Sequence, residues 1–130
     1  MKIKKFTPEN TPSTSRRGVV QISFNRSGLI SISPALSEQM ELDENSCISI
    51  MQDEESPEDW FVAKDADGFA LRANANAKGY NFNSAGLVCA VLDGTVGPKV
   101  RIASFKVSEK INEDAGGYFM HTAAPLKTQD

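Results

Sequence analysis

The sequence predicts a mainly β domain with two short α-helices, in which two similar strand–strand–helix–strand–strand units form a closed or nearly closed barrel. Two observations predict this fold. Short segments alternate apolar and polar residues and are separated by turn-forming Gly, Pro, Asn, Asp and Ser. The same order of segments then recurs about 50 residues later. A chain of 130 residues is the size of one domain, and it can bury about two-thirds of its unfolded surface.

The chain is expected to have three parts. Residues 1–17 form a basic flexible arm, residues 18–125 a single barrel-like domain, and residues 126–130 a tail. Within the arm, residues 7–17 are rich in Pro, Thr, Ser and Asn and show no hydrophobic period. That composition is typical of a mobile or extended segment.

The first unit is expected over about residues 18–64 and begins with two strands. Val20, Ile22 and Phe24 alternate with polar residues, which places their side chains on one face of a strand. Residues 25–28 are typical of a tight turn, because their final glycine tolerates a positive φ. A second short strand with the same alternation follows this turn.

A short helix completes the middle of the first unit. Ser33 suits the N-cap and Pro34 the first helical position, because the N–H that proline lacks is unpaired there in any case. A short helix of about two turns is marked by the apolar residues Ala35, Leu36, Met40 and Leu42. Strands over residues 47–51 and 60–62 then end the unit.

The second unit is expected over about residues 67–123 and repeats this order. Residues 80–82 alternate as the second strand of the first unit does, and a helix over residues 85–92 follows, with its exit at Asp93 and Gly94. Four short strands cannot bury both of their faces alone. Two such units together can close the sheet on itself and remove its exposed edges.

The net charge of −3 hides an uneven distribution of charge. Residues 1–26 have six basic side chains and only Glu9 as an acidic one, so that their net charge is +5, whereas the remaining residues carry −8. Residues 41–59 contain eight acidic side chains and no basic one. The acidic loop over residues 53–59 is therefore a candidate surface for a basic protein partner.

A basic arm on an acidic body can bind phosphates through the arm alone. The leading functional prediction is accordingly a non-catalytic nucleic-acid-binding protein with DNA as its partner. The alternative is a protein-interaction or assembly module that uses the acidic loop. The candidate nucleic-acid-binding residues are Lys2, Lys4, Lys5, Arg16, Arg17 and Arg26.

Residues 28–50 read GLISISPALSEQMELDENSCISI, a glycine, an alternating strand, a short helix, a polar turn and a strand. This order resembles the SpoVT-AbrB family, the swapped-hairpin barrels of bacterial transition-state regulators and antitoxins. The resemblance implies a barrel fold and regulation of transcription through DNA. In that family two chains swap hairpins, which leaves an oligomer open here, although the repeat lets one chain supply both halves. The matching positions are Gly28, Ile30, Ile32, Leu36, Met40, Leu42, Ile48 and Ile50.

The sequence departs from the family pattern at the positions that usually contact DNA. Leu29 stands where the family usually has arginine or lysine, and residues 37–39 contain no basic side chain. Ser33 takes the place of the family proline, with Pro34 one position late. The resemblance therefore supports the fold more than it supports DNA binding.

The residues that carry catalysis or hold metals are sparse in this chain. His121 is the single histidine and no glycine-flanked serine elbow accompanies it, so we expect no enzyme activity. The two cysteines, Cys47 and Cys89, lie in apolar runs and are expected to be buried, inert thiols. Neither a metal site nor a cofactor site is expected. The strand aromatics, Trp60, Phe61 and Phe119 among them, are expected to fill the core.

No apolar run approaches the roughly 20 residues of a membrane span, and no apolar signal stretch follows the first charged residues. We therefore expect a cytoplasmic protein without membrane contact.

Overall fold

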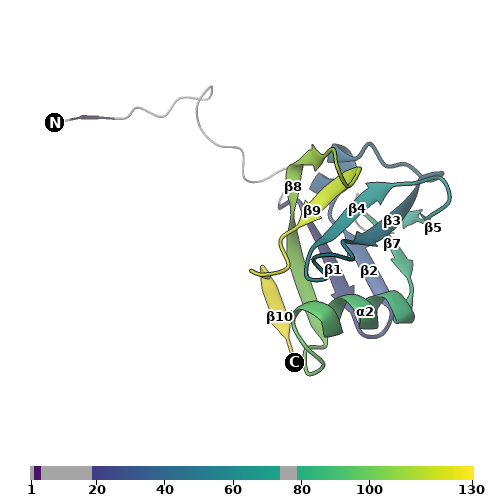
Figure 1. The fold of residues 1–130 in the computed structure, drawn as a ribbon. Coiled ribbons are helices and arrows are strands. Elements are labelled where there is room, and N and C mark those ends of the chain that lie inside the picture. The colour runs from purple at the N-terminus through teal and green to yellow at the C-terminus, as the bar shows by residue number, and fades with distance from the viewer. Residues whose placement is uncertain (1, 4–18, 74–78) are drawn as a thin grey trace.

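The computed structural model describes residues 2–3, 19–73 and 79–130, so most of the arm lies outside the described residues. The described residues form ten strands and two helices (Figure 1). The strands are β1 (Gln21–Asn25), β2 (Leu29–Ile32), β3 (Cys47–Gln52), β4 (Trp60–Lys64), β5 (Phe69–Ala70), β6 (Arg72–Ala73), β7 (Tyr80–Asn83), β8 (Ile102–Asn112), β9 (Gly117–Met120) and β10 (Lys127–Gln129). The helices are α1 (Pro34–Gln39) and α2 (Ala85–Thr95).

All strand pairs in this sheet are antiparallel. Nine strands follow one path in the order β5-β3-β4-β9-β8-β1-β2-β7-β6, and β10 pairs with β8 outside that path. The sheet curls into a nearly closed barrel, with α2 across one end (Figure 1). The predicted fold class, mainly β with two helices in a nearly closed barrel, is confirmed.

The two ends of this path are neighbours in sequence, which is why the barrel nearly closes. Leu71 separates β5 from β6, and β5 pairs with β3 while β6 pairs with β7. The ring of Phe69 stacks on that of Phe82 with the centroids 5.0 Å apart. A Cβ at Gly68 would lie 2.1 Å from the carbonyl oxygen of Ile48, so glycine is needed for the turn before β5 to approach β3 this closely.

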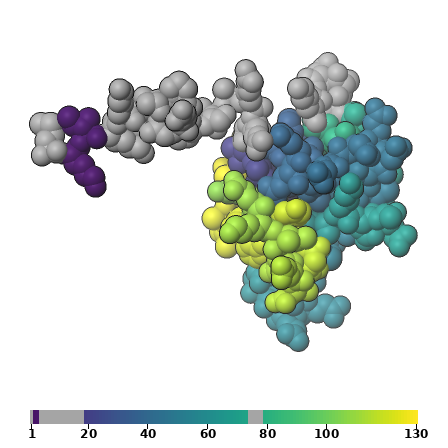
Figure 2. Space-filling model, turned by 90° about the horizontal axis from the view of Figure 1, so that it is seen from above, coloured from purple at the N-terminus to yellow at the C-terminus, as the bar shows by residue number. Residues whose placement is uncertain are grey.

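The predicted order of the two units occurs in the structure, and equivalent hairpins share one register. Phe24 lies opposite Ile30 in the β1–β2 hairpin, and the equivalent Ala73 lies opposite Tyr80 in the β6–β7 pair. The units are joined through equivalent strands, since β2 pairs with β7 and β4 pairs with β9. In the space-filling view, the green-to-yellow residues of the second unit lie directly against the blue and teal residues of the first (Figure 2).

Both helices begin as the sequence predicts. The Ser33 hydroxyl accepts a hydrogen bond from the Leu36 N–H at 3.2 Å, and Ser84 accepts one from the Leu87 N–H at 3.3 Å. The β1–β2 turn also meets the start of α2, because the Ser84 N–H donates to the Gly28 carbonyl at 2.8 Å. Gly28 has a φ of 106°, a conformation that favours glycine.

The end of α2 differs from the prediction, because the helix continues past Asp93 and Gly94 to Thr95. Its exit comes at Gly97, which has a φ of 103° and donates its N–H to the Leu92 carbonyl at 2.8 Å. A glycine in the left-handed region can satisfy the last helical carbonyls, and Gly94 has no need of that conformation.

The core fills the barrel from both units. Phe24 and Phe105 lie at its centre with ring centroids 6.0 Å apart, and both are fully buried. The helices contribute Leu36 from α1 and Val91 and Leu92 from α2. The inward alternation predicted for Ile22 and Phe24 is confirmed, because both side chains are fully buried.

The C-terminal segment 126–130, expected as a tail, contains β10. Thr128 lies opposite Ala103 of β8, and the Leu126 N–H donates to the Ser104 carbonyl at 2.8 Å. The side chains of β10 are exposed, so backbone pairing rather than burial holds this strand. Polar sequence without a hydrophobic period therefore concealed it from prediction.

Candidate functional site

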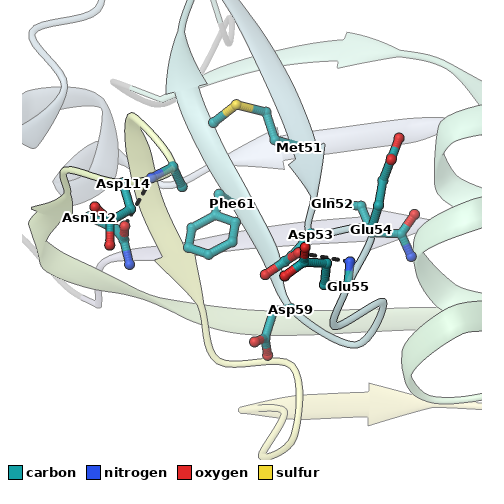
Figure 3. Close-up of a pocket in the computed structure, with 10 residues that line it drawn as sticks. Met51, Gln52, Asp53, Glu54, Glu55, Asp59, Phe61, Asn112 and Asp114 are labelled. Carbon is teal, nitrogen blue, oxygen red and sulfur yellow. Dashed lines mark hydrogen bonds between the residues drawn. The ribbon is translucent and has the colours of Figure 1, made fainter.

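One cavity among the described residues is a groove of about 630 Å³ on the outer face of the barrel. Figure 3 shows Phe61 at its centre, between the β8–β9 turn on one side and the β3–β4 loop on the other. We call this cavity the acidic groove. It is lined by Met51, Gln52, Asp53, Glu54, Glu55, Asp59, Phe61, Asn112, Asp114 and Ala115.

The floor of the acidic groove is apolar. Met51 and Phe61 are cross-strand partners on β3 and β4, and both point away from the core that their neighbour Val62 enters. The Phe61 ring packs edge-on against Phe119 with the centroids 5.5 Å apart. The Phe119 ring in turn packs edge-on against the ring of His121, with the centroids 5.2 Å apart. The groove thus rests on an outer aromatic layer that strand pairing holds in place.

Gly117 makes room for this floor. A Cβ at Gly117 would lie 2.6 Å from Met51 Cε and 3.0 Å from the Val62 carbonyl oxygen. Met51 therefore lies over β9 only because that position has no side chain. The absence of a side chain at Gly117, the first residue of β9, therefore allows the Met51 side chain to take this position.

The β3–β4 loop forms one wall of the groove and has its own hydrogen bonds. The Asp53 N–H donates to the Asp59 carbonyl at 3.0 Å, and the Glu55 N–H donates to Asp53 Oδ1 at 2.9 Å (Figure 3). Gln52 Nε2 donates to the Pro57 carbonyl at 2.7 Å. These bonds close the loop on itself and leave four of its carboxylates exposed, whereas Asp59 is half-buried.

The opposite wall is the turn between β8 and β9. Asn112 Oδ1 accepts a hydrogen bond from the Ala115 N–H at 3.0 Å, and the Asn112 carbonyl accepts one from Gly116 at 2.8 Å. Gly116 has a φ of 73°, so the turn requires a residue that tolerates the left-handed region. This turn presents Asp114 to the groove.

Charge in the groove has one sign. Five carboxylates line it, from Asp53, Glu54, Glu55, Asp59 and Asp114, and no basic side chain of the described residues does. A cleft lined by one sign of charge beside apolar walls concentrates the opposite charge from solution. The groove is therefore complementary to a cation that also carries apolar surface.

The structure describes only two of the six predicted nucleic-acid-binding residues. Lys4, Lys5, Arg16 and Arg17 lie outside the described residues, and the described candidates are Lys2 and Arg26.

Arg26 is held by the α2 end of the barrel. Its Nη2 lies 2.7 Å from Asp93 Oδ1 and donates to the Gly97 carbonyl at 3.0 Å, while its Nε donates to the Val100 carbonyl at 2.7 Å. The hydrogen bond to Asp93 raises the pKa of Arg26 above its ordinary value. The side chain thus already has three acceptors in the folded protein.

Of the predictions for aromatic and cysteine residues, the structure confirms some and corrects others. Trp60 is buried in the core as predicted. Phe61, by contrast, is covered on the outer face, where it forms the groove floor. Cys89 is exposed and Cys47 half-buried, which corrects the expectation of two buried thiols. The small residues on the outward side of α2 leave Cys89 uncovered.

The sequence identified the acidic loop but missed its neighbours. In the sequence, Met51 and Phe61 look like ordinary strand residues. Asn112 and Asp114 lie more than fifty positions from the acidic loop along the chain. A local signal did exist, because residues 112–117 combine Asn, Glu, Asp and two glycines in a turn-forming run. Nothing in that run indicates that it faces the acidic loop.

His121 lies beside a smaller pocket of about 190 Å³. Its Nε2 is 3.0 Å from the Ser108 hydroxyl. In the described part of the chain, no three His, Cys, Asp or Glu side chains gather in a way that could hold a metal ion. No helix there is long and apolar enough to cross a membrane.

Comparison of the chain with protein-family models, with curated proteins and with solved structures finds no match. The resemblance of residues 28–50 to the SpoVT-AbrB family therefore stays a prediction.

Proposed function

We propose that this protein is a non-catalytic interaction module whose acidic groove binds a basic segment of a partner protein. The observation that supports this proposal is the convergence of five carboxylates on an apolar floor, with no basic side chain among the lining residues that the structure describes. The β3–β4 loop and the β8–β9 turn bring these carboxylates together from distant parts of the sequence.

Lysine and arginine fit such a groove better than a simple cation does. Their aliphatic stems can lie on Met51 and Phe61 while their charged ends meet the carboxylates at the walls. A cation over the Phe61 ring also gains a cation–π attraction. The expected partner segment is therefore a short run of basic residues with interspersed apolar ones.

The nucleic-acid hypothesis depends on other residues. Phosphates are repelled by the acidic groove, so that binding would need the arm, residues 1–17, whose five basic side chains and single Glu9 give it a net charge of +4. Arg26 already has three acceptors. DNA binding through the arm stays a prediction, and the experiment below includes it as a separate measurement.

The test is a fluorescence-anisotropy titration of a labelled peptide with four lysines and two phenylalanines. The protein is used at full length in two forms, unmodified and with Lys2→Gln, Lys4→Gln and Lys5→Gln, because the arm has the same charge as the peptide. We expect binding that weakens as salt increases. A peptide with glutamate in place of lysine is expected not to bind.

Two double variants locate the binding surface. Glu54→Lys with Glu55→Lys reverses two charges of the groove, whereas Glu44→Lys with Glu109→Lys makes the same change at exposed positions outside it. We expect the groove variant to lose at least tenfold in affinity and the control variant to lose much less. Equal losses in both variants, or no peptide binding by either form of the protein, would contradict the proposal.

Labelled duplex DNA is titrated in parallel. If the arm binds phosphates, each phosphate that is neutralised adds about −0.9 to the slope of log affinity against log salt. The three lysine substitutions would then flatten the slope by up to about 3. Salt-sensitive DNA binding with this change, without groove-dependent peptide binding, would favour the nucleic-acid alternative.

A further inference from the structure

We propose that the smaller cavity beside His121 is a second part of the same binding surface and takes an arginine side chain of the partner segment. We call this cavity the small pocket. The inference rests on the proposed function, because it assumes that a basic segment lies in the acidic groove. It goes further by specifying a second anchor, its residue type and its spacing from the first.

The small pocket adjoins the acidic groove. Asp59 lines both cavities. Phe61 of the groove and Phe119 of the small pocket are cross-strand partners on β4 and β9, and their ring centroids lie 5.5 Å apart. The Phe119 ring packs in turn against the ring of His121, which also lines the small pocket. A row of three rings therefore leads from one cavity to the other.

The small pocket has the size of a site for one side chain. Its volume of about 190 Å³ is below the roughly 300–1,000 Å³ of cavities that take small-molecule ligands. It is enclosed by the end of the β3–β4 loop, the end of α2 and the segment that begins in β9. The Thr122 hydroxyl donates to the Glu58 carbonyl at 2.8 Å and so joins two of these walls.

The lining of the small pocket favours a guanidinium group. Glu58 and Asp59 supply two carboxylates, and no lysine or arginine is among the lining residues that the structure describes. Phe119 and His121 supply aromatic surface beside them. A guanidinium can bind a carboxylate through two N–H groups and can also stack on an aromatic ring, whereas an ammonium group is a point charge without that plane. Arginine therefore fits this pocket better than lysine.

A buried donor beside the small pocket lacks an acceptor. Trp60 is 5% exposed, and its Nε1 has no hydrogen-bond partner among the residues that the structure describes. Trp60 Cζ2, which is attached to the same ring carbon as Nε1, would lie 3.7 Å from a Cβ at Gly94, a lining residue of the pocket. A buried N–H without an acceptor costs free energy, and a main-chain carbonyl of the bound segment can supply that acceptor.

The row of rings sets the spacing between the two anchors. Because the successive centroids are 5.5 and 5.2 Å apart, the rings of Phe61 and His121 lie at most about 11 Å from each other. Alternate side chains of an extended segment point to the same side and are about 7 Å apart, whereas side chains four residues apart are separated by about 13 Å. We therefore expect the arginine two residues from the side chain that lies on Phe61.

The test extends the lysine–phenylalanine peptide, in the order Phe-Lys-Lys-Lys-Lys-Phe, at both ends, so that either direction of binding brings an extension to the small pocket. One probe adds a glycine and a terminal arginine at each end, and a second probe of the same charge has lysine in place of arginine. We expect the full-length protein to bind the arginine probe at least fivefold more tightly. A third probe with three glycines before each arginine is expected to lose this advantage.

Two variants locate the preference for arginine. Glu58 lines the small pocket but not the groove, and Glu58→Gln removes its charge. Glu44→Gln makes the same change at an exposed position outside both cavities. We expect Glu58→Gln to reduce the preference for the arginine probe over the lysine probe to less than twofold, and Glu44→Gln to leave it unchanged.

The remaining outcomes separate this inference from the proposed function. Equal affinity for the arginine and lysine probes, with loss in the groove variant Glu54→Lys/Glu55→Lys, overturns the arginine site and leaves the proposed function standing. Absence of binding by all the lysine–phenylalanine probes overturns both. A preference for arginine that persists in Glu58→Gln places the arginine elsewhere and overturns the inference.

A second measurement observes the small pocket directly. His121 and Trp60 are the single histidine and the single tryptophan of the chain, so each gives one set of ring signals in an NMR spectrum. At saturating peptide, we expect the His121 ring signals and the Trp60 indole N–H signal to shift at least twice as far with the arginine probe as with the lysine probe. Equal shifts with the two probes, or no shift with either, would overturn the inference.

Discussion

Asp43 shows how a single carboxylate organises the turn between α1 and β3. Its Oδ1 accepts hydrogen bonds from the Asn45 N–H at 2.8 Å and from the Ser46 hydroxyl at 3.1 Å. The Ser46 hydroxyl in turn accepts the Asp43 N–H at 2.9 Å. The bond from Asn45, and then that from Ser46, lower the pKa of Asp43 from its ordinary value. Donors aimed at a carboxylate favour its charged form.

The lowered pKa of Asp43 predicts a pH-dependent contribution to stability. Because the folded-state pKa lies below the unfolded-state value, the contribution is present above the unfolded pKa and is lost as pH falls through the folded one. Asp43→Asn keeps an acceptor oxygen but removes the charge. Thermal melts from pH 7 to pH 2 should show the variant less stable at neutral pH, with the gap closing in acid. A gap that stays constant to pH 2 would contradict this account.

At the scale of elements, α1 is short and depends on its packing. Six residues are too few for a helix to persist alone in water. Its Ser33 cap and Pro34 start favour the helical turn, and Leu36 anchors it in the core with no exposed surface. The same cluster includes Ile48 of β3, the strand that follows α1.

Leu36→Ala should therefore destabilise the protein by about 2–5 kcal/mol, through lost burial and the cavity left behind. Urea unfolding measures the difference. Leu126→Ala is the control, because Leu126 is 47% exposed and surface substitutions usually change stability by about 0.5 kcal/mol or less. An unchanged midpoint for Leu36→Ala would mean that α1 is not docked in the core.

At the scale of the whole molecule, the two units are interleaved rather than placed side by side. β1 of the first unit pairs with β8 of the second, β2 with β7, and β4 with β9. Each unit consequently satisfies much of its backbone hydrogen bonding through the other. Neither unit has a core of its own, because residues of both contribute to one cluster.

Interleaving predicts one cooperative unfolding transition. Trp60 is the single tryptophan and is 5% exposed, in a strand that contacts both β3 and β9. Urea unfolding followed by its fluorescence should coincide with unfolding followed by far-UV circular dichroism. Two separated transitions would indicate units that fold independently.

The strands and helix starts could be predicted from the sequence because they depend on local rules. Alternation at Val20, Ile22 and Phe24 reports which side of a strand is buried, and Ser33 and Ser84 satisfy N–H groups within one helical turn. The recurrence of segments indicated two equivalent units. The acidic loop at residues 53–59 was also visible, because its charge is contiguous along the chain.

Only the tertiary structure decided which surfaces meet. Hydrophobic period tells which face of a strand is buried, but strand pairing and loop position depend on packing between distant residues. That packing placed Asp114 opposite the acidic loop, made Phe61 a groove floor and joined Arg26 to Asp93. The sequence by itself therefore determined most of the elements, though not β10 or the end of α2, and the distribution of charge. The acidic groove arose from the pairing of β4 with β9, which places the β3–β4 loop and the β8–β9 turn on neighbouring hairpins of the sheet.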